Sequence, residues 1–205
     1  MKRPLTAKEV INMPHEMIEL GGVWKDCVGA MSRHGVVFVW GNSGNGKTSA
    51  VMSLCKELAV FGKVLYVPLE EGYSLSIKET LKRFDMQECG SSFNVVDSCT
   101  MEELDERLGK RRAPEFVVID SFQYMQMSYR NYINFKNRHP NKLLILVSHA
   151  DGKQPAGRAA KSIMYDAGLK IWVEGYKAFS KGRFIGSSGE AVIWEKGAAE
   201  YWKGL

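Results

Sequence analysis

One stretch of this sequence has the residue types and the spacing needed to bind phosphate. Residues 41–48 read Gly-Asn-Ser-Gly-Asn-Gly-Lys-Thr and satisfy the pattern G-x-x-x-x-G-K-[ST] in full. Glycines let backbone N–H groups curl around phosphate oxygens, and the start of a following helix adds its positive end. In this pattern Lys47 reaches the β- and γ-phosphates, and the Thr48 hydroxyl ligates Mg²⁺. The nucleotide-binding residues that this pattern predicts are Gly41, Asn42, Ser43, Gly44, Asn45, Gly46, Lys47, Thr48 and Ser49.

The neighbours of this phosphate-binding loop (residues 41–48) have the pattern that such a loop requires. Residues 36–40 are apolar without polar alternation, which is typical of a strand buried on both faces. A helix is expected from the loop to about Phe61. The alternative is a glycine-rich turn that matches by chance, but the strand and helix together favour nucleotide binding, with ATP and Mg²⁺ as the expected ligands.

Two further apolar runs end in carboxylates. Residues 116–119 lead into Asp120, which can hold the magnesium shell directly or through water. Residues 63–69 lead into Glu70 and Glu71, where a carboxylate can face the γ-phosphate and act on an attacking water. The alternative is an exposed acidic pair on a loop, which is the commoner fate of such residues. The position opposite Lys47 favours catalysis of hydrolysis, with Glu70 preferred over Glu71 as the base.

The wider pattern predicts an α/β fold. Short apolar runs alternate with amphipathic stretches, which indicates βαβ units and a mostly parallel central sheet flanked by helices. Beyond residue 162 three short strands, separated by glycine-rich turns, predict an antiparallel extension of that sheet. The strands are expected at residues 36–40, 63–69, 93–96, 116–119, 143–147, 170–173, 176–179 and 191–194, and the helices after the loop at 75–84 and 101–110.

The first 34 residues differ from the rest and are expected to form a helical segment, with residues 35–205 as one nucleotide-binding domain. Residues 6–9, Thr-Ala-Lys-Glu, can form a capping box at a helix start. Apolar residues then follow at loosely helical spacing to Leu20, interrupted by Pro14. Packing against its own domain is favoured over binding to a partner.

Composition excludes several classes of protein. The 205 residues include 28 Lys+Arg and 23 Asp+Glu, a formal net charge of +5, with 45% hydrophobic and 25% charged residues. No apolar run approaches about 18 residues, so no membrane span is expected. No apolar stretch follows the N-terminal Met-Lys-Arg-Pro, so no secretory signal is expected. The 4 cysteines lie far apart, which argues against zinc and disulfides and predicts reduced thiols in a cytoplasmic protein. The basic excess permits a polyanionic partner without requiring one.

These residues resemble the RecA-like ATPase core shared by RecA recombinases, KaiC-type ATPases and DnaB-type replicative helicases. Residues 67–71, Val-Pro-Leu-Glu-Glu, resemble the strand-end glutamate of that group. Ser148-His149 resembles the polar sensor of the γ-phosphate, with His149 where many relatives carry glutamine. Residues 165–167 resemble the stretch after the second DNA-binding loop of such proteins. The resemblance covers residue 35 to the end of the chain, and compact phage- or mobile-element-type members are closest in size.

The resemblance also implies an oligomer, a ring or a filament. Lys181-Gly182-Arg183, followed by Gly186 and Gly189, resembles the Lys-x-Arg finger of replicative helicases, which completes a neighbouring subunit's site. Alternation along a strand places Lys181 and Arg183 on one face, so both cations can point at one target. The alternative is that they solvate an exposed edge strand.

Two segments of this chain lie at positions that carry the DNA-binding loops in the resembled family. Residues 121–130 mix aromatics with Arg130, and a helix whose Tyr and Met side chains pack inward explains them equally well. Residues 151–161 are expected to form a flexible basic loop, in which Lys153, Arg158 and Lys161 can neutralise phosphates of single-stranded DNA. An ordinary mobile surface loop is the alternative.

The leading hypothesis is a Mg²⁺-dependent ATP hydrolase of RecA-like type that couples ATP binding and hydrolysis to DNA binding in recombination or replication. A second hypothesis is a KaiC-like, nucleotide-gated assembly or signalling ATPase with a protein partner. A third is an ATP-binding scaffold with negligible turnover. Stimulation of hydrolysis by single-stranded DNA would separate the first from the other two. Helicase activity, strand polarity and the identity of any partner protein are not determined by the sequence.

Overall fold

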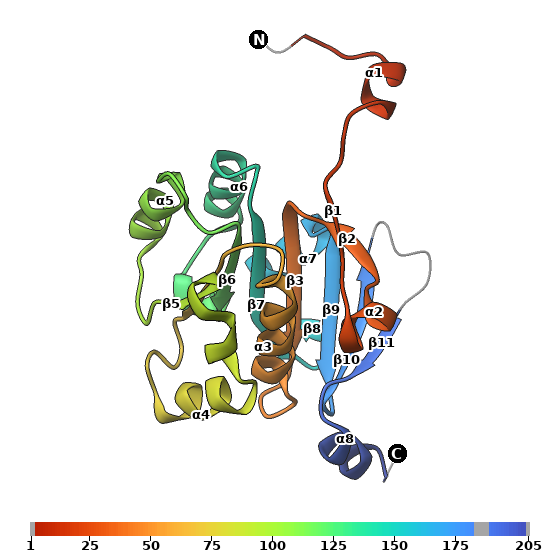
Figure 1. Cartoon of the computed structure of the whole chain (residues 1–205), viewed down its shortest axis with the longest axis vertical. Helices are drawn as coiled ribbons and strands as arrows, with labels where there is room; N and C mark the ends of the chain where they lie inside the picture. The colour runs from red at the N-terminus through yellow and green to blue at the C-terminus, as the bar shows by residue number, and fades with distance from the viewer. Residues whose placement is uncertain (1–2, 183–188, 204–205) are drawn as a thin grey trace.

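Nine strands of the described chain form one mixed, mostly parallel sheet. The computed structural model describes residues 3–182 and 189–203 (Figure 1). The strands of this sheet are β3 (Gly35–Gly41), β4 (Val64–Pro68), β5 (Phe93–Val95), β6 (Phe116–Asp120), β7 (Leu143–Asp151), β8 (Gln154–Pro155), β9 (Leu169–Glu174), β10 (Lys177–Gly182) and β11 (Gly189–Val192). Their order is β11-β10-β9-β3-β7-β6-β4-β5, and β8 pairs with the end of β7.

The six strands from β9 to β5 in this order are parallel, and β10 and β11 add to them antiparallel. The central strands are buried apolar runs because helices cover both of their faces. The predicted α/β fold with a mostly parallel sheet and an antiparallel C-terminal extension is therefore confirmed.

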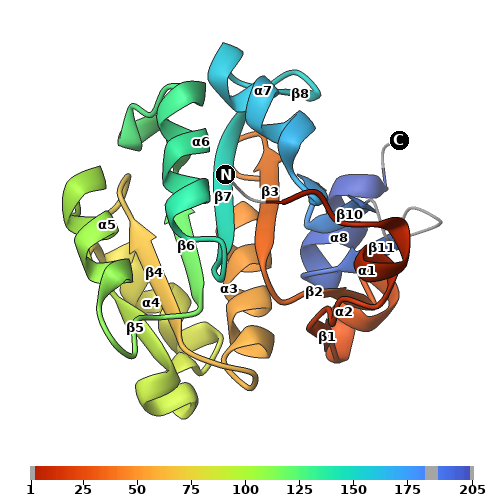
Figure 2. The ribbon, with the colours of Figure 1, turned by 90° about the horizontal axis from the view of Figure 1, so that it is seen from above.

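Helices lie on both sides of the sheet (Figure 2). On one face lie α2 (Gly22–Cys27), α3 (Lys47–Leu58) and α4 (Leu75–Arg83), and on the other lie α5 (Met101–Gly109), α6 (Tyr129–Arg138) and α7 (Arg158–Asp166). The short 3₁₀ helices are η1 (Met86–Ser92) and η2 (Phe122–Met125), and α8 (Glu195–Trp202) follows β11. Across the described part of the chain, no helix has the length and apolar character to cross a membrane.

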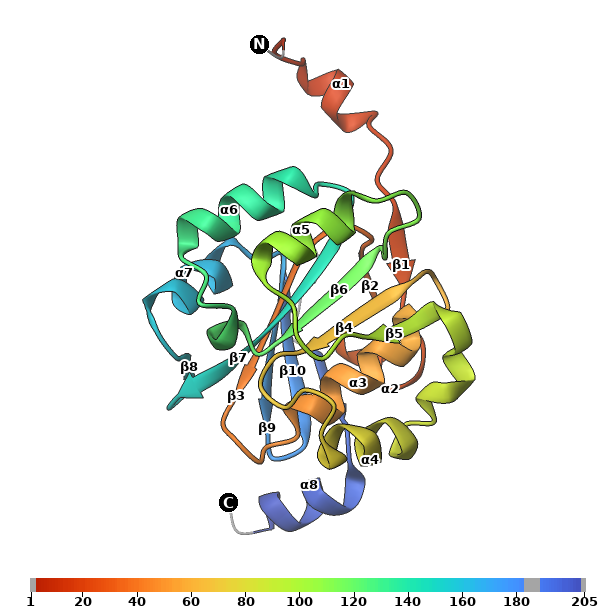
Figure 3. The ribbon, with the colours of Figure 1, turned by 90° about the vertical axis from the view of Figure 1, so that its left-hand side faces the viewer.

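The N-terminal segment differs from the predicted helix that packs on its own domain. The helix α1 (Ala7–Ile11) begins with the predicted Thr6–Glu9 capping box but has only 5 residues. It stands away from the rest of the fold (Figures 1 and 3), and Ile11 is 80% exposed. Pro14 explains the early end, because proline lacks an N–H donor and disfavours helical geometry in the residue before it.

Residues after Pro14 form a hairpin and a helix that belong to the main core. The strand β1 (Met17–Glu19) pairs antiparallel with β2 (Ala30–Ser32), so the spacing that suggested a helix is here a strand with only Ile18 buried. Between them α2 buries Trp24, whose indole N–H donates to Ser53 Oγ of α3 at 3.1 Å. Residues 17–32 are therefore part of the packed body.

Two further segments differ from the sequence predictions. The basic segment expected to be a flexible loop contains β8 and the first turn of α7, since apolar residues at positions 160, 163, 164 and 167 have helical spacing. Phe122, Met125 and Met127 are buried core residues, as in the alternative that packs them inward. Trp194, expected to end a strand, is instead the N-cap of α8.

The packing predicts a large difference in stability between Trp24→Ala and Ile11→Ala. Trp24 is 1% exposed, so its truncation leaves a cavity and an unpaired Ser53 hydroxyl, and we expect a loss of about 3–5 kcal/mol of unfolding free energy. Ile11 contributes little burial, and its truncation should cost less than about 0.5 kcal/mol. Urea unfolding followed by far-UV circular dichroism measures both. Equal losses would contradict the assignment of α2 to the core.

Candidate functional site

The phosphate-binding loop connects the end of β3 to the start of α3, as predicted. The strand ends at Gly41 and the helix begins at Lys47. Gly46 has a φ of 91°, in the left-handed region that favours glycine, and this conformation turns the chain into the helix. At Gly41 the carbonyl oxygen of Val173 fills the space that a side chain would need. The loop therefore offers backbone N–H groups and a helix N-terminus to an anion.

The turn between β9 and β10 holds this loop in place through hydrogen bonds to Asn45. The backbone N–H of Gly175 donates to Asn45 Oδ1 at 2.9 Å, and that of Tyr176 donates to the Asn45 carbonyl at 3.1 Å. The Tyr176 ring lies against Gly46. These contacts join residues about 130 positions apart, so local sequence patterns did not reveal them.

A cavity of about 380 Å³ opens beside the loop and brings most of the predicted site residues together. Glu70, Glu71, Asp120 and His149 line it. The loop residues that line it are Ser43, Gly44, Gly46, Lys47, Thr48 and Ser49. The predicted Gly41, Asn42 and Asn45 are not among the lining residues, and the Asn42 carbonyl accepts a hydrogen bond from Lys47 Nζ at 3.0 Å.

Burial perturbs the two central charged groups of the cavity in opposite directions. Burial raises the pKa of Asp120 to about 6, although a hydrogen bond from Tyr66 and the charge of Lys47 oppose the shift. Burial also lowers the pKa of Lys47, against the attraction of Asp120 and Glu70. Both groups thus lose hydration on folding, and the contacts that they make in the protein do not fully replace it. This favours the binding of further charged atoms in the cavity.

Glu70 and Glu71 have different surroundings. Glu70 Oε2 lies 2.8 Å from His149 Nε2, and the same ring nitrogen is 3.1 Å from Ser121 Oγ. Glu71 Oε2 instead accepts from the Ser74 hydroxyl at 3.3 Å, at the N-cap of α4. Glu70 is therefore the carboxylate held toward β7, consistent with its preference as the candidate base.

Gln123 is a site residue that the sequence did not single out. Its Nε2 donates to Ser148 Oγ at 2.7 Å and to the Ala156 carbonyl at 3.2 Å. Its Oε1 accepts from the His149 backbone N–H at 3.3 Å. The amide thus links the strand that carries His149 to the chain that enters α7. A polar residue within an otherwise apolar 3₁₀ segment was the only available signal.

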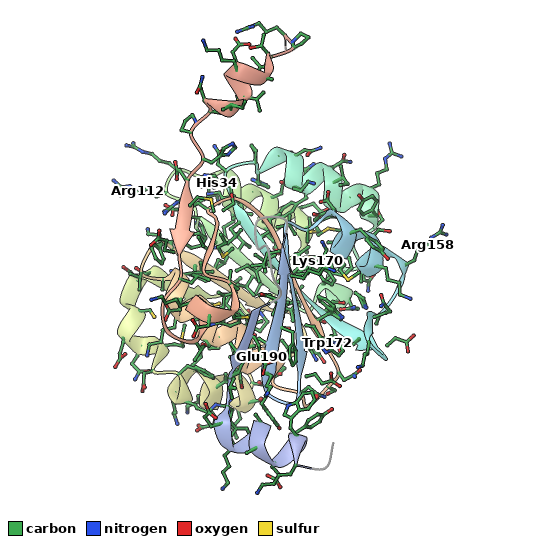
Figure 4. The ribbon with its side chains drawn as sticks, turned by 90° about the vertical axis from the view of Figure 1, so that its right-hand side faces the viewer. His34, Arg112, Arg158, Lys170, Trp172 and Glu190 are labelled. Carbon is green, nitrogen blue, oxygen red and sulfur yellow. The ribbon has the colours of Figure 1, made fainter. Side chains whose placement is uncertain are left out.

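The four candidate DNA-binding cations are exposed, and they lie on three elements. Lys153 lies in the turn between β7 and β8, and its carbonyl accepts from the Trp40 indole at 3.2 Å. Arg158 and Lys161 are on α7, and Arg158 extends away from the body (Figure 4). Arg130 lies in the first turn of α6, which packs against α7.

The structure does not bring Lys181 to the cavity of its own chain. It is exposed on β10, opposite Lys170 of β9. Because β10 runs antiparallel to β3, its end lies toward the amino end of β3, away from the phosphate-binding loop. Arg183 lies outside the described residues.

Thr48 and Asp120 are the side chains that can hold a magnesium ion here. They supply a hydroxyl and a carboxylate, the oxygen ligands that Mg²⁺ prefers, and both line the cavity. The described residues contain no cluster of three or more His, Cys, Asp or Glu suited to a metal. A protein site for Mg²⁺ that uses one or two side chains plus phosphate oxygens does not need such a cluster.

No protein-family model matches this chain, and no curated protein matches its sequence significantly.

The geometry predicts that Lys47→Ala separates nucleotide binding from stability. Loss of a charged hydrogen-bond donor should weaken nucleotide binding by about 10- to 100-fold, from about 1.5–3 kcal/mol per charged contact. The unfolding free energy should stay within about 1 kcal/mol of wild type, because burial already disfavours the charged amine. Titration with a fluorescent ADP analogue and urea unfolding measure the two effects. Lys56→Ala, on the same helix but paired with Glu88, serves as the control and should bind normally.

Proposed function

We propose that this chain is a Mg²⁺-dependent ATP hydrolase with a RecA-like core. The observation that carries the proposal is the cavity in which Lys47, Thr48, Asp120 and Glu70 meet. A glycine-rich loop at a helix N-terminus suits phosphate, and Asp120 and Thr48 suit its metal. Glu70 adds a carboxylate that faces the same space. Each part alone is common, whereas their convergence from three strands is the arrangement that phosphoryl transfer requires.

In this proposal the loop N–H groups and Lys47 bind and orient the phosphates. Thr48 and Asp120 would hold Mg²⁺, which supplies neutralisation of the phosphate charge when bound. Glu70 accepts a proton from, or orients, the attacking water. His149 fixes one oxygen of the Glu70 carboxylate, which limits its rotation and leaves the other oxygen for the water.

The contacts around His149 also support coupling between the nucleotide and DNA. His149 touches Glu70, and its backbone is tied through Gln123 to Ala156, two residues before Arg158. A change of contact at the γ-phosphate can therefore reach the basic surface formed by Lys153, Arg158 and Lys161. We propose that this surface binds single-stranded DNA in recombination or replication.

The proposal includes a homo-oligomer. Lys181 is exposed and far from its own cavity, so it could act only on another molecule's site, together with Arg183. An added cation at a transferring phosphoryl group can increase the rate by about 10³–10⁵.

Glu70→Gln is the direct test of the proposed chemistry. An amide cannot accept the proton, so we expect hydrolysis to fall by about 10²–10⁴ while ATP still binds. Glu71→Gln is the matched control, because Glu71 lines the same cavity but pairs with Ser74. Turnover of ATP and binding of a fluorescent ATP analogue are measured for both. Normal turnover in Glu70→Gln would refute its role as base, and loss in Glu71→Gln alone would transfer that role.

The DNA partner is tested by the salt dependence of binding. We expect single-stranded DNA to stimulate hydrolysis and to bind with an affinity that falls as salt rises. Replacing Lys153, Arg158 and Lys161 by alanine should reduce the log–log salt slope by about 0.7 for each DNA phosphate that these side chains neutralise. Replacing the exposed Lys8, Lys25 and Lys63 is the control and should leave the slope unchanged. Hydrolysis without any response to DNA would favour the KaiC-like alternative.

A further inference from the structure

Tyr66 lies directly beneath the candidate magnesium-binding carboxylate. It is on β4, in register with Val118 of β6, so its side chain shares a face with Asp120 two residues further along. The phenol is fully buried and its hydroxyl donates to Asp120 Oδ2 at 2.6 Å. Stacking on Phe93, with ring centroids 6.3 Å apart, fixes the orientation of the ring.

Asp120 needs such a partner for a physical reason. Burial of a carboxylate costs free energy unless hydrogen bonds replace its hydration. The last side-chain torsion of an aspartate is also only weakly restricted, so a hydrogen bond is needed to fix which oxygen faces which way. Glu70 and Glu71 raise the pKa of Asp120 further by repulsion, while Lys47 opposes them. Burial and the Asp120 charge raise the pKa of Tyr66, so the phenol stays protonated and can only donate to the carboxylate.

We propose that Tyr66 is a positioning residue for the magnesium site. By occupying Oδ2, its hydroxyl leaves Oδ1 of Asp120 as the oxygen that faces the cavity. The ligand oxygen is then oriented before the metal binds. The side-chain entropy of Asp120 is lost on folding and does not have to be lost again on metal binding. This inference rests on the proposed function, because it assigns a role within the same site.

Tyr66→Phe tests the proposal through metal dependence rather than activity alone. Binding of a fluorescent ADP analogue is titrated with Mg²⁺, and also measured in EDTA. We expect the Mg²⁺ concentration for half-maximal effect to rise about tenfold, the size typical of removing the partner behind a metal ligand. The affinity in EDTA should be unchanged, because the substitution removes only the Tyr66 hydroxyl, which donates to Asp120 and not to the phosphate-binding loop. A variant damaged in its fold would lose both.

Tyr132→Phe is the matched control. Tyr132 is also fully buried, and its hydroxyl donates to the carboxylate of Asp166 on the other face of the sheet. Its removal should leave the Mg²⁺ dependence at the wild-type value. A shift of equal size in Tyr132→Phe would overturn the specific role of Tyr66.

Comparing Asp120→Asn with the Asp120→Asn/Tyr66→Phe double variant covers the case in which Tyr66→Phe alone fails to fold. Both carry a neutral amide in place of the carboxylate that Tyr66 would orient, so they should show the same Mg²⁺ dependence. A further shift in the double variant would overturn the proposal, as would a Tyr66→Phe variant that responds to Mg²⁺ like wild type. A wild-type protein that does not bind nucleotide, or that does not respond to Mg²⁺, would instead contradict the proposed function itself.

Discussion

The parallel alignment of β3, β4, β6 and β7 is the constraint on which the site depends. Parallel strands end at the same edge of a sheet, so whatever follows each of them is brought together there. The register places Gly41 beside His149 and Pro68 beside Asp120. Because β7 lies between β3 and β6, His149 stands between the phosphate-binding loop and the candidate metal ligand. A shift in register would separate these groups.

The cavity concentrates charge that its own residues only partly balance. Asp120, Glu70 and Glu71 line it together with one lysine, Lys47, and burial disfavours the charged forms of both Asp120 and Lys47. The charges of these side chains are not balanced by one another. A ligand that carries both positive and negative charge can balance them. A metal–phosphate pair has this character, which connects the electrostatics of the fold to the proposed chemistry.

Hydrogen bonds between neighbouring elements fix the phosphate-binding loop and two carboxylates of the cavity. Asn45 is held by the β9–β10 turn, Glu70 by His149, and Asp120 by Tyr66. Gln123 connects the strand that carries His149 to the chain entering α7, so hydrogen bonds join the cavity to the segment that carries Arg158. The N-terminal helix α1 takes no part in this network and stands apart from it (Figure 1).

The sequence alone determined the phosphate-binding loop, the buried strands and the carboxylates after them, because each depends on residues close in the chain. It also indicated the antiparallel C-terminal strands through their glycine-rich turns. Only the tertiary structure decided that Glu70 pairs with His149 across 79 positions and Asp120 with Tyr66 across 54. It also decided that residues 17–19 form a strand. Strand register and packing select such partners, and local propensity carries no information about either.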